Sequence, residues 1–242
     1  MTIEALHYQF KLNMDRVDSL SNVDFNPAEI DWLLNEAQMV FIHQRLNPSS
    51  NSKQVGFEET QKRTDDLSTL VVQSPLQPPI IPSLDQGVYE VPTDKCILPY
   101  LHLVSATADV QISPACIKRV RLKFMQHDDS KEVLKDPFNS PSLEFIPYNF
   151  GRSSSSPGVP SIYIYPNDLK ILRVYPEYIK YPSKPYLGTY LDESGMTHPP
   201  TTLELPSHTH QEIVDIACTI AALNTQSPSY IQLKNIKTQI HE

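Results

Sequence analysis

Apolar residues recur at helical spacing in a long segment near the start of the chain. Asn26 is suited to cap a helix, and Pro27 suits its first position. Five apolar residues then share one face: Ile30, Leu33, Leu34, Ala37 and Phe41. The pattern predicts an amphipathic helix over residues 27–46 that stops before Asn47-Pro48.

Two more segments are interpreted as helices. Residues 57–67 (FEETQKRTDDL) read as a short, heavily charged helix, and Thr209 with Glu212 has the order of a capping box before a helix over 209–223. This last helix is apolar on nearly every side: Ile213, Val214, Ile216, Ala217, Cys218, Ile220, Ala221 and Leu223. Such a helix must be covered from several directions, and we expect the helix of residues 27–46 and another subunit to cover it.

From Gly87 onward the apolar spacing approaches a period of two, which is typical of strands. Strands are expected at residues 70–72, 87–91, 100–106, 117–124, 161–165 and 169–175. The last two flank the turn Pro166-Asn167-Asp168, which predicts a β-hairpin. Residues 2–17 follow neither period cleanly, so they are interpreted as a weak helix or an extended arm.

Together these patterns predict an α+β fold with a helical part and a central antiparallel β-sheet or small β-sandwich. The expected regions are a helical region 1–72, a proline-rich linker 73–86, a β-rich region 87–202, a helix within 203–224 that packs on the N-terminal helices, and a docking tail 225–242. The tail carries apolar residues among polar ones, and we expect it to dock on a partner: Ile231, Leu233, Ile236 and Ile240.

Proline content changes this picture most. The 242 residues include 22 prolines, about twice the usual share of ~5%, and four of them fall between Ser74 and Pro82. Proline lacks an amide proton, so that stretch fits neither a helix interior nor a central strand. Extended segments of this kind suit arms that reach onto neighbouring molecules.

Charge and cysteine usage limit the classes of function. A net charge of −8 argues against tight binding of nucleic acid, which needs a dense Lys/Arg surface. Cys96, Cys116 and Cys218 are widely spaced in apolar surroundings, so we expect buried thiols in a reducing compartment. No apolar run approaches the ~20 residues of a membrane span, and the start lacks a signal-peptide pattern, so synthesis in the cytoplasm is expected.

No local catalytic signature is found, so no enzyme activity, cofactor or metal is expected. His208 and His210 could be two metal ligands, but no further ligand follows at a suitable spacing, and we interpret them as polar residues at a helix start. Asp128 and Asp129, beside His127, could be an acid pair or a cation site. The surrounding QHDDSKEVLKD is more typical of a solvated turn that leads into a short helix.

The most informative candidate site is a basic strand. Within residues 117–124, Val120, Leu122 and Phe124 alternate with Arg119, Arg121 and Lys123, which predicts one buried and one basic face. The candidate contact residues for a subunit or a DNA channel are Lys118, Arg119, Arg121 and Lys123. The alternative interpretation is the ordinary wet side of a half-buried strand.

Several stretches resemble the neck ring proteins, or head-to-tail connectors, of crAss-like phages and related podoviruses of Bacteroidetes. The similar stretches are AEIDWLLNEAQMVFIHQRL (28–46), GFEETQKRTDDLSTLVV (56–72), DPFNSPSLEFIPYNFGR (136–152) with SIYIYPNDLKILRVYPEYIKYP (161–182), and LELPSHTHQEIVDIACTIAALN (203–224). Together they cover about two fifths of the chain.

The resemblance implies a non-enzymatic virion protein. It implies a closed ring, of twelve copies, that is assembled in the bacterial host, joins the portal to other neck or tail ring proteins, and lines the channel through which DNA passes without sequence-specific binding. Two alternatives stay open. One is a tail hub or adaptor, and the other is a glycan-binding or hydrolytic tail module that uses its tyrosines to stack on sugar rings: Tyr163, Tyr165, Tyr175, Tyr178, Tyr181, Tyr186 and Tyr190.

Overall fold

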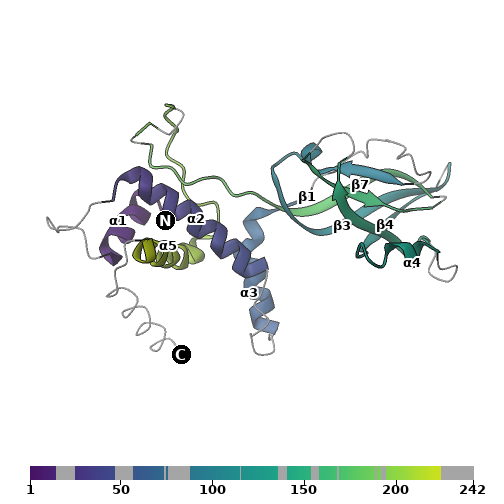
Figure 1. Ribbon diagram of the computed structural model, residues 1–242, viewed down its shortest axis with the longest axis horizontal. Coiled ribbons are helices and arrows are strands. Elements are labelled where there is room, and N and C mark those ends of the chain that lie inside the picture. The colour runs from purple at the N-terminus through teal and green to yellow at the C-terminus, as the bar shows by residue number, and fades with distance from the viewer. Residues whose placement is uncertain are drawn as a thin grey trace. The chain divides into compact units, whose positions relative to one another are not determined.

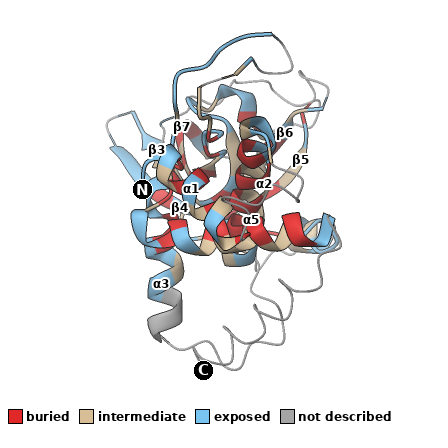
Figure 2. Cartoon of the chain, turned by 90° about the vertical axis from the view of Figure 1, so that its left-hand side faces the viewer, coloured by how far each residue is buried: buried red, intermediate tan, exposed pale blue. Residues whose placement is uncertain are grey.

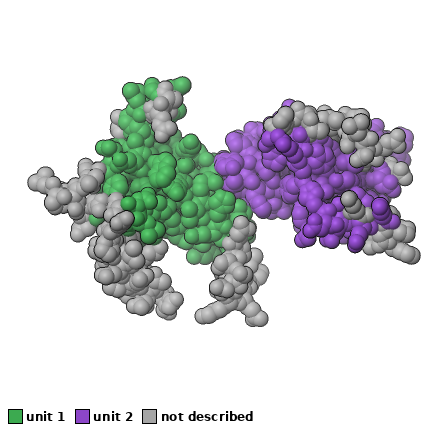
Figure 3. Space-filling model, viewed as in Figure 1, with its two compact units in different colours: residues 1–70, 182–242 green, residues 71–181 purple. Residues whose placement is uncertain are grey.

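The computed structural model of the chain shows an α+β fold (Figure 1). It describes residues 1–14, 25–46, 57–73, 75, 88–114, 116–135, 141–153, 158–167, 169–188, 190–191 and 195–224. The chain forms two compact units, which Figure 3 distinguishes by colour. The helical unit comprises residues 1–70 and 182–242, and the β unit comprises residues 71–181.

The helical unit contains every long helix that the sequence predicts. Its elements are α1 (Ile3–Asn13), α2 (Pro27–Leu46), α3 (Phe57–Leu67), the 3-10 turns η1 (Ser68–Leu70) and η3 (Ser207–Thr209), and α5 (His210–Asn224). The five apolar residues predicted to share one face of α2 are all buried. Residues 3–13, interpreted as a weak helix or an arm, are helical, and they bury Ile3, Leu6 and Phe10.

Helix α5 packs against α1 and α2 of the same chain, and Figure 2 shows buried residues on both α2 and α5. Its innermost residues Ile213, Val214 and Ala217 are fully buried. The predicted packing on the helix of residues 27–46 is therefore confirmed. Helix α1 supplies much of the cover that was expected from another subunit, so the apolar composition of α5 does not by itself require a second copy.

The capping box predicted at the start of α5 is wrong. The hydroxyl of Thr209 donates to the carbonyl of Pro206 at 2.9 Å, and the carboxylate of Glu212 binds the guanidinium of Arg45 instead. A local sequence match could not anticipate this, because Arg45 lies 167 residues away along the chain. The tertiary ion pair replaces the local hydrogen bond.

The β unit is built on one curled, mixed seven-stranded sheet. Its elements are β1 (Val71–Gln73), β2 (Tyr89–Pro92), the 3-10 turn η2 (Thr93–Lys95), β3 (Tyr100–Ser113), β4 (Cys116–Phe124), α4 (Ser130–Lys135), β5 (Ile146–Arg152), β6 (Pro160–Ile164) and β7 (Lys170–Lys180). The strand order is β1-β7-β3-β4-β5-β6-β2. All neighbours are antiparallel except β4 and β5, which are parallel at Leu122–Phe124.

The predicted hairpin of residues 161–175 is wrong, because β6 and β7 do not pair. Strand β6 lies between β5 and β2, and β7 lies between β3 and β1. The predicted turn residue Asn167 does have a turn conformation, with a positive φ of 55°. The chain uses this turn to pass from one part of the sheet to another, and the strand β5 was not predicted.

The unit boundaries differ from the regions expected from the sequence. Residues 182–202 were grouped with the β-rich region, but they belong to the helical unit. Their backbone is tied there by the side chain of Gln38, whose amide donates to the carbonyl of Ser183 at 3.2 Å, and by Glu204, whose carboxylate accepts the N–H of Ser183 at 3.1 Å. Most of the expected linker, residue 74 and residues 76–86, lies outside the described residues.

The expected buried thiols are only partly confirmed. Cys218 is buried on α5, Cys96 is half-buried, and Cys116 is exposed at the start of β4. All three are free cysteines. Among the described residues, none of the helices has the length and apolar content needed to cross a membrane.

Candidate functional site

The predicted basic strand is β4, and its side chains alternate as expected over most of its length. Val120 and Leu122 are buried, whereas Arg119, Arg121 and Lys123 are exposed. Lys118 is exposed as well, but it shares the parity of Val120, so it does not lie on the same face as the other three cations. The structure thus brings three of the four predicted contact residues onto one face.

Phe124 was expected to be buried with Val120 and Leu122, and this expectation is wrong. Its side chain is 57% exposed at the end of β4. The ring lies against Tyr148 and Phe150 of β5, with centroid distances of 5.7 and 6.0 Å. The parallel neighbour β5 therefore supports Phe124 from one side and leaves the other side open.

Arg119 of β4 is held by groups on the neighbouring strand β3 and on β7, which lies beyond β3. Its Nε donates to Asp109 Oδ1 at 2.8 Å and its Nη2 donates to Oδ2 at 3.2 Å. The guanidinium also lies 4.0 Å from the ring centroid of Tyr175, whose hydroxyl donates to Asp109 Oδ2 at 2.9 Å. The three side chains form a ladder across β4, β3 and β7 on the exposed face.

This ladder shifts the pKa values of both charged groups in the direction that keeps them ionised. The hydrogen bond from Arg119 lowers the pKa of Asp109, and the hydrogen bond to Asp109 raises the pKa of Arg119. The Arg119 side chain is 56% exposed, so solvent screens the pair strongly. Arg119 is consequently a positioned surface cation.

The other two cations on this face have weaker described contacts. Lys123 Nζ lies 5.3 Å from the ring centroid of Phe145, and Arg121 lies opposite Thr107 of β3. These cations keep their charge toward solvent, as a docking surface would need. The ordinary wet-face interpretation fits the same observations.

The turn end of the β3–β4 hairpin adds apolar surface beside these cations. Ile112 is 46% exposed and Ile117 is 59% exposed. Strand β4 pairs with β5 only from Leu122 onward, so among the described residues the segment 116–121 has β3 on one side and no strand on the other. A free strand edge with exposed apolar side chains can receive a partner.

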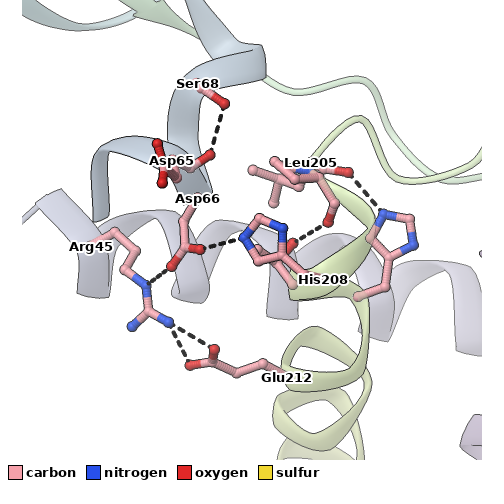
Figure 4. Close-up of polar contacts among 10 residues, drawn as sticks. Arg45, Asp65, Asp66, Ser68, Leu205, His208 and Glu212 are labelled. Atoms are coloured by element: carbon pink, nitrogen blue, oxygen red, sulfur yellow. Dashed lines mark hydrogen bonds and ion pairs between the residues drawn. The ribbon is translucent and has the colours of Figure 1, made fainter. Parts of the chain in front are cut away.

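The helical unit contains a second kind of polar cluster, which is buried. Asp66 on α3 is fully buried and accepts from Arg45 Nε of α2 and from His208 Nε2, both at 2.8 Å. Figure 4 shows Asp66 between these two side chains, with Glu212 of α5 on the guanidinium at 2.7 and 2.9 Å. This Arg45–Asp66 cluster braces α2, α3 and α5 together.

A third cluster surrounds Asp31 of α2, which is 4% exposed. Its Oδ1 accepts from His7 Nε2 of α1 at 2.7 Å, while its Oδ2 accepts from the Leu187 N–H at 2.9 Å and from the Tyr190 hydroxyl at 2.5 Å. Sequence reasoning missed this cluster, although a signal existed. Asp31 sits beside the apolar stripe of α2, where an acid is found only when it is paired.

The histidines considered as metal ligands have other roles. His208 belongs to the Arg45–Asp66 cluster, and His210 Nε2 hydrogen bonds the Leu205 carbonyl at 2.8 Å. Burial lowers the pKa of His210. Among the described residues, no group of three or more His, Cys, Asp or Glu side chains is arranged to hold a metal ion.

Beside the Asp31 cluster the helical unit has a pocket of about 1100 Å³. Its lining includes Trp32, Pro185, Tyr186, Tyr190, Leu191 and His198. The rings of Tyr186 and Tyr190 lie 4.7 Å apart between centroids, and His198 meets Tyr186 edge-on at 5.1 Å. We call this feature the aromatic pocket. It was not predicted, because its residues come from α2 and from a segment that was grouped with the β-rich region.

The tyrosines considered as a sugar-stacking set are divided between the two units. Tyr186 and Tyr190 lie in the helical unit, whereas Tyr163, Tyr175 and Tyr178 lie in the β unit. Of these, Tyr178 is completely buried. The tail residues Ile231, Leu233, Ile236 and Ile240 lie outside the described residues.

No protein-family model matches the chain, and no match is found among curated proteins.

Proposed function

We propose that this protein is a non-enzymatic structural subunit that assembles into a closed ring in the neck of a tailed phage. The ring joins the portal to the tail and surrounds the channel for DNA. The observation that carries this proposal is that each unit has its own core and still exposes large apolar side chains close together, on α1 in the helical unit and at the turn end of the β3–β4 hairpin in the β unit. Grouped exposure of this kind marks contact surfaces in proteins that assemble.

In the helical unit the exposed pair lies on α1. Tyr8 is 62% exposed and Leu12 is 55% exposed, and residues four apart stand on the same face of a helix. The opposite face of α1 is buried against α5. Because the core is already complete behind them, these two side chains are available for another copy.

In the β unit the exposed pair is Ile112 and Ile117 at the turn end of the β3–β4 hairpin, with Arg119 and Arg121 further along β4. A closed ring needs two different surfaces on each subunit, so that the contact is heterologous. The face of α1 and the hairpin are two such surfaces. The resemblance to phage neck ring proteins supports the same function. Its segment 28–46 covers α2 from the second residue onward, and its segment 203–224 contains α5.

The mass of the purified protein tests this proposal. We expect a discrete ring, alone or on an added portal, with a mass of about twelve times 27.5 kDa by native mass spectrometry. A species that stays monomeric at every concentration and joins no portal would contradict it.

A matched pair of variants localises the contact. Tyr8→Gln with Leu12→Gln preserves charge and helix propensity but removes the apolar face of α1, so ring assembly should require about tenfold more protein or more. Glu4→Gln alters the same exposed face of α1 without removing apolar surface, and it should assemble normally. Circular dichroism should be unchanged in both.

A further inference from the structure

Aromatic rings and prolines make up much of the lining of the aromatic pocket, beside the polar residues Asn35, Lys184 and Thr201. Both carboxylate oxygens of Asp31 already accept hydrogen bonds, the Tyr190 hydroxyl donates to Asp31, and the Tyr186 hydroxyl donates to the Tyr190 carbonyl. Trp32, by contrast, is 57% exposed. The pocket therefore suits a ligand that packs on aromatic rings and that needs no hydrogen bond from Asp31 or from the hydroxyls of Tyr186 and Tyr190.

A proline-rich peptide has this chemistry. Proline has no N–H to satisfy, its ring packs flat against aromatic side chains, and its fixed φ reduces the entropy lost on binding. Grooves lined by tryptophan and tyrosine are the recurrent receptors for such peptides. The indole N–H of Trp32 adds one donor, which can reach a backbone carbonyl of the peptide.

The chain itself contains a segment that fits this description. Residues 75–82 read PLQPPIIP, with prolines at 75, 78, 79 and 82 and no charged residue. In a polyproline II conformation three residues make one turn, so prolines three apart project from the same edge. Prolines 75 and 78 make one such pair, and prolines 79 and 82 make a second.

We propose that the aromatic pocket binds the proline-rich segment 75–82 of a neighbouring copy, and this inference rests on the proposed ring. The segment belongs to the β unit, between β1 and β2, and the pocket belongs to the helical unit. Their contact joins unlike surfaces of two copies, which is the heterologous kind that closes a ring.

The charge of the two units favours this pairing between copies. The helical unit has 17 Asp and Glu against nine Lys and Arg, so it carries the whole net charge of −8. The β unit has eleven of each and is neutral. Contacts between helical units of two copies are repulsive, whereas a contact between a helical unit and a neutral β-unit segment is not.

Trp32 gives a direct readout, because it is the only tryptophan of the chain. A synthetic peptide of residues 74–83 should shift and saturate the tryptophan fluorescence of the full-length protein at concentrations below those at which it assembles. A peptide with Pro78→Ala and Pro79→Ala should bind at least about tenfold more weakly. Absence of a saturable change, or equal binding of both peptides, overturns the assignment of the pocket.

Complementation between two variants tests whether the bound segment comes from a neighbouring copy. Trp32→Ala removes the receptor and Pro78→Ala with Pro79→Ala removes the ligand, so each protein alone should fail to form the ring. Mixed in equal amounts, they restore one intact contact for each pair of subunits, and a species of twice the subunit mass should appear. Glu4→Gln, on α1 and outside the lining of the aromatic pocket, should leave peptide binding equal to that of the wild type.

The outcomes separate this inference from the proposed ring. If Trp32→Ala still forms the normal ring, the inference fails and the ring stands. The wild-type protein could instead form no ring and bind its own segment in the pocket. The peptide would then compete only weakly, and the two variants would form no mixed pair. That result overturns both the binding of a neighbouring copy's segment and the proposed ring. If oligosaccharides quench Trp32 and the proline peptide does not, the pocket belongs to a glycan-binding module and the inference is overturned.

Discussion

The helical unit and the β unit handle charge in opposite ways. The helical unit buries carboxylates between its elements: Asp31 and Asp66 are 4% and 0% exposed, and each is hydrogen-bonded by two or more groups. The β unit holds its clearest ion pair, Asp109 with Arg119, on the exposed face of the sheet. A buried charge is costly without its partners, and an exposed one is not.

The difference teaches which charges are structural and which are available to other molecules. Among the described residues of the β unit, Glu90 is the buried carboxylate, and it accepts hydrogen bonds from the hydroxyls of Ser153 and Ser161. In the described part of that unit, the Asp109–Arg119 pair links β3 and β4 at the surface, whereas Asp66 joins α2, α3 and η3 from a buried position. The exposed cations of β4 therefore remain accessible to a partner, with Arg119 positioned by Asp109 and Tyr175.

Replacing Asp31 with alanine should have the largest effect. The change removes the acceptor of three donors on α1 and on the 187–190 segment, and it leaves His7 buried without its partner. We expect a loss of about 4 kcal/mol in the free energy of unfolding. Urea denaturation followed by circular dichroism measures it.

Tyr190→Phe is a smaller change in the same cluster, because it removes only one of the three donors to Asp31. Its expected cost is about 1 kcal/mol. If Asp31→Ala cost no more than Tyr190→Phe, the buried carboxylate would not organise the cluster, and the contrast between the two units would lose its main support.

Replacing Asp66 with alanine should come second, with a loss of about 3 kcal/mol. The smaller value follows from its partners: the Arg45 side chain is 17% exposed and keeps Glu212, and His208 is 56% exposed. Asp65→Ala removes an exposed acid from the adjacent position of α3 and should change the urea midpoint little. Equal midpoints for the two variants would show that Asp66 does not brace the helices.

The sequence predicted the helices well because their signal is local. The stripe of α2 and the charged pattern of α3 specify a period and two ends without reference to the rest of the chain. Which strands pair is not specified by a local sequence pattern of this kind. The turn at Asn167 predicts a chain reversal, but whether β6 then pairs with β7 depends on β2, β3 and β5, which lie elsewhere in the sequence.

The same distinction between local patterns and long-range contacts applies to the candidate sites. The alternation of Arg119, Arg121 and Lys123 is local, and it was predicted. Their partners were not, and neither was the pairing of His7 with Asp31 across 24 residues, because those contacts exist only when α1 packs on α2. The aromatic pocket could not be predicted at all, since it requires the 184–201 segment to lie against α2.

The third prediction concerns how the stability of the helical unit changes as the pH falls. Burial lowers the pKa of His210 in the folded state, so the unfolded chain binds a proton at a higher pH than the folded chain does. Stability should therefore fall as the pH drops from above 6.5, the usual value, toward the lowered folded pKa. The slope from this one group is at most about 1.4 kcal/mol per pH unit. His210→Gln keeps a donor for the Leu205 carbonyl and should flatten the dependence measured by urea denaturation between pH 7.5 and 5.5; an unchanged slope would remove His210 from the explanation.

The smallest effect is expected for Arg119→Ala, which removes the exposed ion pair of the β unit. Arg119 lowers the pKa of Asp109, so the stability from the pair is present at neutral pH and is lost as the pH falls through that lowered pKa. Because the guanidinium lies in solvent, we expect no measurable change in the urea midpoint at pH 7, with or without 1 M salt. Arg121→Ala is the matched control, since it removes a cation from the same face that faces Thr107 instead of an acid. If Arg119→Ala shifted the midpoint as far as Asp66→Ala does, the exposed ladder would be as structural as the buried brace. The cations of β4 could then no longer be regarded as free for a neighbouring subunit.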